Sequence, residues 1–427
     1  RENIVLWMRD VLSNSVAKNA VSLYLIQFAD YILPLITVPY LVKALGLAGF
    51  GMVAFSQSLI AYLALFVDYG FALSATRKIS VERDNPVAVS HTVFNIWAAK
   101  TILCVAGFMA LFLLISVVPK LQGVATLLMV LYCTVIGNVL FPVWLFQGME
   151  KMIFISMINL VMKLLVVAGI FTLVHQPKDY LVYAWLTSIG SIGAGLTGLV
   201  VALSKFKLRV VLPSLRGIRE ALKEGWILFL SMASISLYTV GNAFILGLLT
   251  NHTVVGYYAA AEKIVKGILG LLSPISQAAY PRFSKMASES KELTIQWGQR
   301  MLHLMGGLGF ILSITTFVGA PLIVRIVLGP NYEPSIMVMR ILAGLCFLIS
   351  ISNVLGAQIM FPFHYEKAVF AVVLTAGIIN IVLALLLVPL WRANGMALSV
   401  LVSEAFVTIS CFYYLWEKRL NPFKQAK

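Results

Sequence analysis

Four lysines lie inside long apolar stretches of this sequence: Lys100, Lys163, Lys263 and Lys266. Placing an ionised side chain in hydrocarbon costs about 2.5–3.5 kcal/mol, so such residues usually face a cavity or a partner. Several ammonium groups around one cavity would attract an anionic ligand, and phosphate suits such point charges. We therefore expect these four lysines to bind an anionic substrate.

Carboxylates also lie inside the apolar stretches, at Asp30, Asp68, Glu262 and Glu404. A carboxylate in such surroundings is a candidate site for a coupling proton or metal cation. Asp30 stands one turn before Pro34, where a proline kink frees carbonyl oxygens that help to hold an ion. We expect Asp30, Asp68 and Glu262 to take part in ion coupling, whereas Glu404 is the weaker candidate.

Simpler explanations exist for several of these charges. Glu262 and Lys266 are four residues apart, so they can pair on one helix face without binding anything else. Asp68 can bond to backbone or to Arg77. Arg340 lies near the end of its apolar stretch, where a long side chain can extend to the membrane surface.

The elements that carry these residues are apolar segments long enough to cross a bilayer. The chain of 427 residues is 60% hydrophobic and only 11% charged, with a mean hydropathy of +0.94. Segments of about 20 apolar residues cross a bilayer as helices. We expect twelve such helices, at residues 17–42, 52–73, 92–118, 122–147, 152–174, 179–203, 225–249, 254–279, 298–323, 334–360, 366–390 and 394–416.

The net charge of +15 is explained by topology rather than by nucleic-acid binding. With twelve spans and a cytoplasmic N-terminus, most Lys and Arg residues fall on the cytoplasmic side, as the positive-inside rule requires. The outer loops would hold only Lys43, Lys120, Lys178, Arg325 and Arg392. Both termini are therefore expected in the cytoplasm.

The longest polar interruption divides the chain into two halves of six spans. We expect an N-terminal six-helix bundle at 1–204, a basic cytoplasmic linker at 205–224 and a C-terminal six-helix bundle at 225–427. Since six is even, both halves enter the membrane in the same sense, which suits alternating access about a central cavity. The linker is either a surface amphipathic helix or a solvated segment. The glycines between Gly190 and Gly198 are expected to allow close helix packing.

Motifs for catalysis are missing from the sequence. It contains no Walker A loop, no HExxH and no GxSxG beside a suitable His and Asp. The cysteines lie in apolar spans without metal-ligand spacing and are interpreted as small core residues, so no metal site is expected. We expect a transporter rather than an enzyme, with no cofactor apart from a coupling H⁺ or Na⁺.

The segment SLYLIQFADYILPLITVPYLVKALGLAGFGMVAFSQS, followed by FVDYGFALSATRKIS, closely resembles the start of the polysaccharide-transporter family. These are the Wzx-type flippases of O-antigen and capsule repeat units, in the same superfamily as MATE drug exporters and lipid II flippases. The resemblance implies an all-α, MATE-like membrane fold. It also implies movement of undecaprenyl-pyrophosphate-linked oligosaccharide from the inner to the outer leaflet of a bacterial inner membrane, by ion-coupled alternating access.

The resemblance also bears on the site residues. Lys100, Lys163, Lys263 and Lys266 would attract the diphosphate and sugar head, and the arginine of the ATR segment, Arg77, would guard the cytoplasmic entrance. Arg300, near the inner end of its span, is expected to bind substrate with them. The expected partners are the lipid-linked oligosaccharide, membrane lipids, a polymerase and a chain-length regulator, with no nucleic acid. The alternative function is a MATE-like cation-coupled exporter of drugs or small molecules, for which a cavity rich in carboxylates and aromatics is expected.

Overall fold

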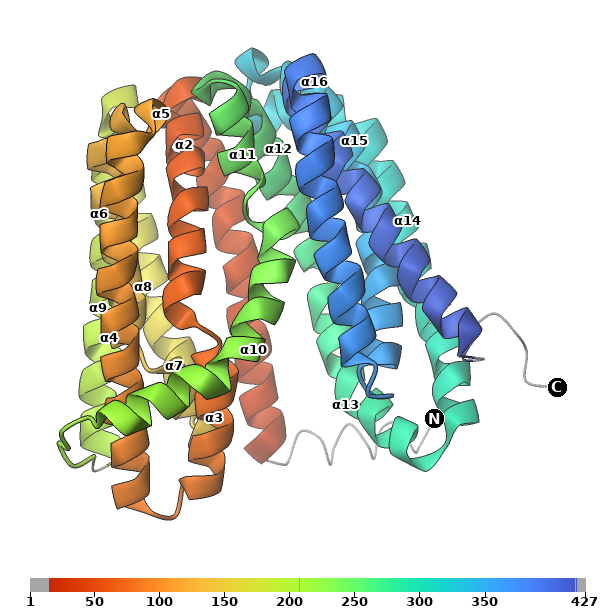
Figure 1. Ribbon diagram of the computed structural model, residues 1–427. Helices are drawn as coiled ribbons and strands as arrows, with labels where there is room; N and C mark the ends of the chain where they lie inside the picture. The colour runs from red at the N-terminus through yellow and green to blue at the C-terminus, as the bar shows by residue number, and fades with distance from the viewer. Residues whose placement is uncertain (1–14, 207, 419, 421–427) are drawn as a thin grey trace. The chain divides into compact units, whose positions relative to one another are not determined.

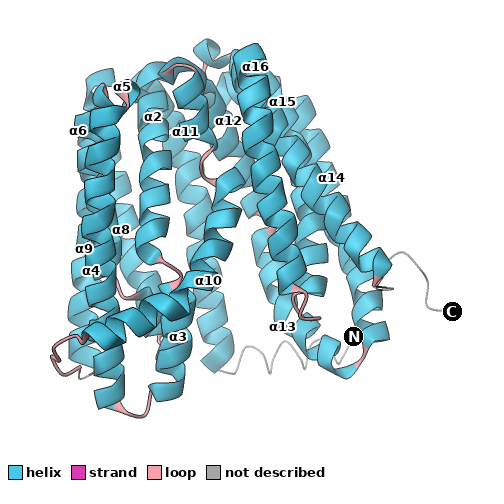
Figure 2. Cartoon of the chain, viewed as in Figure 1, coloured by secondary structure: helices cyan, strands magenta, loops and turns pink. Residues whose placement is uncertain are grey.

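The computed structural model describes residues 15–206, 208–418 and 420, with side chains from residue 33 onward apart from positions 237, 278, 281, 282, 284, 285 and 288. Within these ranges every regular element is a helix, as Figure 2 shows. A helix satisfies all its backbone hydrogen bonds internally, which a chain this apolar needs in a bilayer. The expected all-α class is confirmed.

Within residues 15–206 the structure describes eight α-helices (Figure 1). They are α2 (Ser15–Asp68), α3 (Phe71–Glu82), α4 (Pro86–Val117), α5 (Pro119–Gln122), α6 (Ala125–Leu140), α7 (Val143–Gly148), α8 (Met152–Leu173) and α9 (Tyr180–Lys205), with the short 3₁₀ segment η1 (Pro177–Asp179) before α9. The long α2 consists of two helices that meet at Gly46, whose φ of 68° and ψ of 175° are essentially open to glycine alone. This break lies between the first two apolar segments that the sequence predicts, 17–42 and 52–73.

Within residues 208–418 the structure describes seven further α-helices. They are α10 (Leu215–Thr239), α11 (Asn242–Leu249), α12 (His252–Gly270), α13 (Ser273–Glu289), α14 (Lys291–Ile323), α15 (Pro334–Asn353) and α16 (Glu366–Glu417). The π-helical segments η2 (Val324–Leu328) and η4 (Val354–Met360) extend α14 and α15, and the 3₁₀ segment η3 (Pro330–Tyr332) precedes α15. Like α2, α16 is interrupted, at Arg392, whose φ is 49°.

Eight segments of the described chain are long and apolar enough to cross a membrane. Two of them, 33–82 and 366–417, contain the interruptions at Gly46 and Arg392. The protein is therefore a multi-pass membrane protein. The number of twelve spans and the cytoplasmic position of the termini stay predictions.

The helices group into two compact units. The first contains the chain up to Leu33 and residues 60–175 and 179–232, and the second contains residues 34–59, 176–178 and the chain from Ala233 onward. Both α2 and α10 contribute to each unit. The expected boundaries at 1–204, 205–224 and 225–427 stay predictions.

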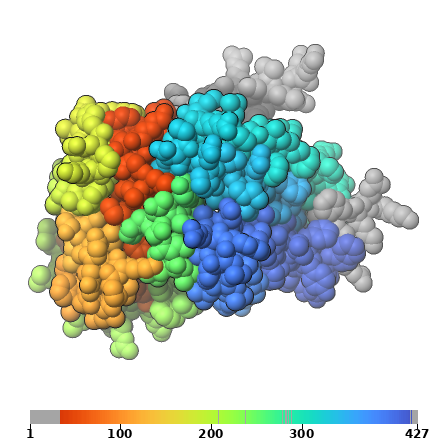
Figure 3. Space-filling view, turned by 90° about the horizontal axis from the view of Figure 1, so that it is seen from above, coloured from red at the N-terminus to blue at the C-terminus, as the bar shows by residue number. Residues whose placement is uncertain are grey.

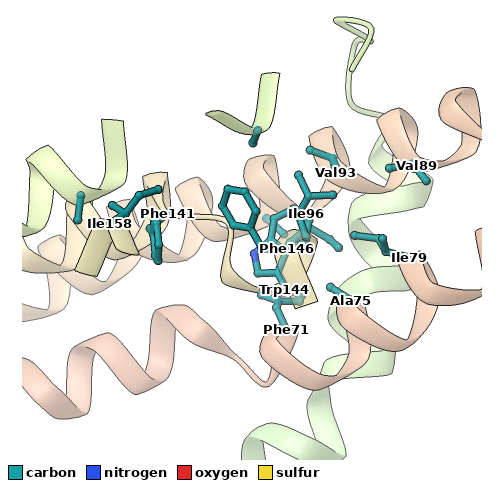
Figure 4. Packing of buried hydrophobic residues seen from close by; sticks show 14 of the residues in the cluster. Phe71, Ala75, Ile79, Val89, Val93, Ile96, Phe141, Trp144, Phe146 and Ile158 are labelled. Carbon is teal, nitrogen blue, oxygen red and sulfur yellow. The ribbon is translucent and has the colours of Figure 1, made fainter. Parts of the chain in front are cut away.

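The core of the first unit gathers around the short helix α7. Trp144 and Phe146 are almost fully buried and lie at the centre of the cluster in Figure 4, between Phe71 of α3 and Ile96 of α4. Just before Phe71, the backbone of Tyr69 and Gly70 turns through two positive φ angles, 48° and 77°, which separate α3 from α2. This break directs α3 against α7.

Glycines bring α6 and α9 together in the first unit. A Cβ atom on Gly195 of α9 would lie 2.5 Å from the carbonyl oxygen of Gly137 in α6. A Cβ on Gly198 would meet the ring of Phe141 at 2.2 Å. In a lipid phase, helices associate through such close packing and through hydrogen bonds. The packing role expected for the glycines of segment 190–198 is confirmed.

The expected linker is partly helical and packs on the first unit. Helix α10 begins at Leu215, and Ile218 on its first turns is buried in the core around α7. Two backbone amides that precede α10 donate hydrogen bonds to side chains of α4. The amide of Ser214 donates to Asn95 Oδ1 at 2.9 Å, and the amide of Arg209 donates to Ser90 Oγ at 3.0 Å. Thus residues 209–218 are held by α4 and the core rather than being freely solvated.

Helices α14, α15 and α16 form the main packing layer of the second unit. Helix α15 contacts both α14 and α16, and these segments adjoin in the teal-to-blue part of Figures 1 and 3. Buried residues from α14, η4 and α16, including Met305, Ile359 and Cys411, form one apolar cluster.

Candidate functional site

A buried ion pair joins two helices of the first unit. Asp68 is the last residue of α2, and its Oδ1 accepts a hydrogen bond of 2.7 Å from Nζ of Lys100 in α4. The same ammonium group lies 3.4 Å from the carbonyl oxygen of Asn138, near the end of α6. The Lys100 side chain is only 3% exposed, whereas that of Asp68 is 49% exposed. The pair therefore presents a carboxylate edge outward and keeps the ammonium group inside.

The sequence did not indicate this pairing. Lys100 has no acidic residue within reach on its own helix, and Asp68 was expected to bond to backbone or to Arg77. The structure places Asp68 at a helix end, where the break at Tyr69 and Gly70 aims it at α4. Because the charge of Lys100 is already neutralised, its availability for an anionic ligand depends on breaking the pair.

The second unit contains the i,i+4 pair between Glu262 and Lys266 that the sequence predicts. Lys266 Nζ lies 3.0 Å from Glu262 Oε1 and also donates to the carbonyl oxygen of Thr239 at 3.1 Å. The same Glu262 oxygen accepts a bond of 3.2 Å from the hydroxyl of Tyr258. Lys266 is 56% exposed and Glu262 16% exposed, so the ammonium group is the more accessible of the two.

This pair lies on the wall of a cavity of about 380 Å³ inside the second unit. Residues of α10, α11, α12, α15, η4 and α16 line it. Most of the wall is apolar, and its polar groups include Tyr238, Asn242 and Asn353. Cavities of this size with a few converging polar groups are typical binding sites.

Glu404 of α16 adds a second carboxylate to the cavity wall. It is 5% exposed, and its Oε1 accepts a bond of 2.6 Å from the hydroxyl of Ser352 in α15. In the described part of the chain no cation pairs with it. A buried carboxylate without a basic partner is suited to take up a proton or a cation. The sequence showed Glu404 as an acid within a span, but not that it shares a cavity with Glu262.

Lys263 lies on α12 beside this pair, and its Nζ stands 5.1 Å from the ring centre of the buried Phe50. An ammonium group over an aromatic face is stabilised electrostatically. Phe50 comes from the part of α2 that belongs to the second unit. Lys263 is therefore held by an aromatic ring and does not line the cavity of Glu262 and Glu404.

The other predicted site residues are dispersed. Lys163 of α8 and Arg77 of α3 have exposed side chains, and Arg300 of α14 lies over the Trp297 ring at 5.6 Å. Asp30 is part of α2, but its side chain lies outside the described residues. Among the described residues no group of three His, Cys, Asp or Glu is placed to hold a metal ion. The functional roles of Lys163, Arg77, Arg300 and Asp30 stay predictions.

The sequence model of the family described as "Polysaccharide biosynthesis protein" matches residues 16–287. This chain belongs to that family. The match covers the Asp68–Lys100 pair and the Glu262–Lys266 pair, whereas Glu404 lies beyond it. The opening segment that carries the resemblance also lies within it.

Two named relatives are similar to this chain over nearly its whole length. A protein of Escherichia coli (strain K12) named "Putative O-antigen transporter" is 31% identical over 406 residues, which are 95% of this chain and 98% of that protein. A protein of Shigella dysenteriae with the same name is 30% identical over 408 residues, covering 92% and 98%. Both matches cover a larger part of the chain than residues 16–287.

Solved membrane transporters share the fold of this chain, and two of them superpose well. The lipid II flippase MurJ in an inward closed conformation superposes with a TM-score of 0.70 over 93% of this chain and 87% of its own. An inward-facing multidrug resistance MATE family transporter of the MOP superfamily superposes with a TM-score of 0.67, over 91% and 98%. Each is 12% identical in sequence, so these likenesses describe the fold alone. The expected MATE-like fold is confirmed.

Proposed function

We propose that this protein is a flippase for a lipid-linked oligosaccharide. The observation that carries the proposal is the similarity along 95% of the chain to a protein named as an O-antigen transporter. The fold shared with a lipid II flippase and the absence of catalytic motifs from the sequence support it. The substrate would be an O-antigen or capsule repeat unit on undecaprenyl pyrophosphate, moved from the inner to the outer leaflet of the bacterial inner membrane.

The cationic residues supply the chemistry for the diphosphate head in this proposal. Lys266 combines an exposed ammonium group with a position on the cavity wall, so it is available to an anionic head that enters the cavity. Lys263, Lys163, Arg77 and Arg300 would add to the electrostatic attraction along the route. Lys100 would contribute only when Asp68 releases it.

Deletion of the gene in its host tests the substrate. Undecaprenyl-linked single repeat units should accumulate on the cytoplasmic side of the membrane, and long surface polysaccharide should disappear. A plasmid copy of the gene should restore both, and a copy carrying Lys266→Gln should restore them less well. Normal surface polysaccharide in the deletion strain would refute the proposal.

Ion coupling is proposed for the carboxylates of the cavity, Glu262 and Glu404, with Asp68 and Asp30 as further candidates. Glu404 has the strongest case because it is buried and has no basic partner among the described residues. A proton or Na⁺ bound there would neutralise the charge and alter the hydrogen bond to Ser352 across α15 and α16. Binding would thus be linked to the packing of these two helices.

The coupling proposal is tested in proteoliposomes with a fluorescent lipid-linked substrate. A proton or sodium gradient should accelerate flipping by the natural protein, and Glu404→Gln should abolish the acceleration while leaving gradient-free flipping measurable. Glu417→Gln, an exposed carboxylate at the end of the same helix, is the matched control and should behave like the natural protein. Full acceleration in Glu404→Gln would remove Glu404 from the mechanism.

One observation favours the alternative, a cation-coupled exporter of drugs or small molecules. The cavity combines two carboxylates with Tyr238 and Tyr258 in an otherwise largely apolar wall, which is the composition expected for a cationic, aromatic substrate. Unchanged surface polysaccharide together with increased drug sensitivity of the deletion strain would select this function.

A further inference from the structure

A second hollow in the second unit holds a cation that no described residue neutralises. It has a volume of about 530 Å³ and lies between α14, α15 and α16. Its walls are apolar side chains apart from Ser313 of α14 and Arg340 of α15. Arg340 is the only charged residue among those that line it. We call this hollow the Arg340 groove.

The guanidinium group of Arg340 is incompletely satisfied. Its Nε is buried and has no hydrogen-bond partner, and no carboxylate in the described part of the chain pairs with the side chain. The guanidinium group lies over the ring of Phe317 in α14, 5.5 Å from its centre. A guanidinium carries five N–H donors in a fork that matches phosphate oxygens. The guanidinium group therefore keeps N–H donors that no acceptor in the described part of the chain occupies.

Arg340 lies near the start of α15, where the predicted topology places the membrane surface. It stands six residues after Pro334, the start of α15, which is about 9 Å along the helix axis. Long side chains on a helix point back toward its N-terminus, so the guanidinium group lies nearer that end. The groove is lined by the last turns of α14, the first turns of α15 and the turns of α16 that follow Arg392. These parts of the three helices lie near the same end of the unit.

The rest of the groove is suited to a hydrocarbon chain. Ile314, Phe317 and Met337 line it and are about half exposed, so they face the surroundings of the unit rather than its core. The missing side chain of Gly344 lets Leu401 of α16 lie against α15, because a Cβ there would be 2.8 Å from Leu401 Cδ1. An apolar groove with one cation in its wall complements an amphiphile with one anionic head.

We infer that the Arg340 groove binds an anionic glycerophospholipid of the surrounding membrane, with the phosphodiester on Arg340 and an acyl chain along Phe317, Ile314 and Leu401. A single guanidinium matches the single negative charge of a phosphodiester, whereas a diphosphate would need further cations. The bound lipid would hold α14, α15 and α16 together at this end. The inference requires only that the protein spans a membrane and does not depend on the proposed flippase activity.

Native mass spectrometry of the purified full-length protein tests the inference, with phosphatidylglycerol and phosphatidylethanolamine as probes. The natural protein should bind its first phosphatidylglycerol at lower concentration than phosphatidylethanolamine. Arg340→Gln should weaken phosphatidylglycerol binding about tenfold or more, since a hydrogen bond to a charged group is lost. Arg325→Gln, an exposed arginine near the same end that pairs with Glu333, is the matched control and should change nothing.

A second variant keeps the charge and fills the groove. Ile314→Trp should also abolish the preference for phosphatidylglycerol while Arg340 remains, which separates loss of the site from loss of folding. Equal binding of the two lipids by the natural protein, or an unchanged preference in both variants, would overturn the inference. Displacement of phosphatidylglycerol by undecaprenyl phosphate would also overturn it, because the groove would then belong to a prenyl lipid.

Discussion

At the scale of single residues, the charges inside the apolar helices differ in what surrounds them. Lys100 is neutralised by Asp68, and Lys266 is paired but half exposed on a cavity wall. Glu404 and Arg340 lack an ion partner among the described residues. A charge that is already paired mainly fixes neighbouring helices, whereas an unpaired charge is available to a ligand. The environment, rather than the residue type, separates the two roles.

Removal of Lys100 is expected to destabilise the protein through the charge it leaves behind. Lys100→Met should lower the melting temperature in detergent, and the double variant Lys100→Met/Asp68→Leu should recover part of the loss. We expect a coupling energy of about 1 kcal/mol, at the low end of values for contacting pairs, because Asp68 is half exposed.

A double-mutant cycle on the exposed pair Arg83–Glu150 is the control for this measurement. The Arg83 Nη1 to Glu150 Oε1 distance is also 2.7 Å, but the side chains are 45% and 72% exposed. Exposed pairs contribute little, so its coupling energy should be close to zero. Equal coupling energies in the two cycles would show that burial of Lys100 does not strengthen its pair.

At the scale of elements, interrupted helices position the candidate site. Asp68 reaches Lys100 because α2 ends at the positive φ angles of Tyr69 and Gly70. The cavity of Glu262 and Glu404 takes polar groups from both sides of the break between α10 and α11, and from the junction of α15 with η4. Interruptions of this kind are tolerated at membrane depth only where protein or a cavity satisfies the freed backbone groups.

The packing of α6 against α9 is expected to depend on the missing side chain of Gly195. Gly195→Ala places a Cβ 2.5 Å from a backbone oxygen of α6, which only a shift of the helices can relieve. The melting temperature should therefore fall. Gly307→Ala in α14 is the control, because its Cβ would meet nothing within 4 Å. That change should be neutral or stabilise the helix by up to about 1 kcal/mol.

At the scale of the whole molecule, the sequence predicts the fold better than the site. Apolar runs and glycine positions locate most helices, the turn at Gly46 and the close packing around Gly195, because these depend on local sequence. The Glu262–Lys266 pair is equally local, at one helical turn. The Asp68–Lys100 pair and the shared cavity of Glu262 and Glu404 join residues 32 and 142 positions apart (100 − 68 and 404 − 262), so only the packing of the helices reveals them.

The predicted topology places the breaks at Gly46 and Arg392 on the outer side of the membrane, with both termini in the cytoplasm. Single cysteines in a background without the four native ones test this arrangement. Cysteines replacing Lys120 and Arg392 should react with a membrane-impermeant maleimide on spheroplasts. Cysteines replacing Arg83 and Glu417 should react only after permeabilisation.

The four positions carry exposed side chains in the structure, so failure to react from either side would reflect membrane burial rather than packing. Because Arg392 and Glu417 flank the second limb of α16, reaction of both from the same side would show that this limb does not cross the membrane.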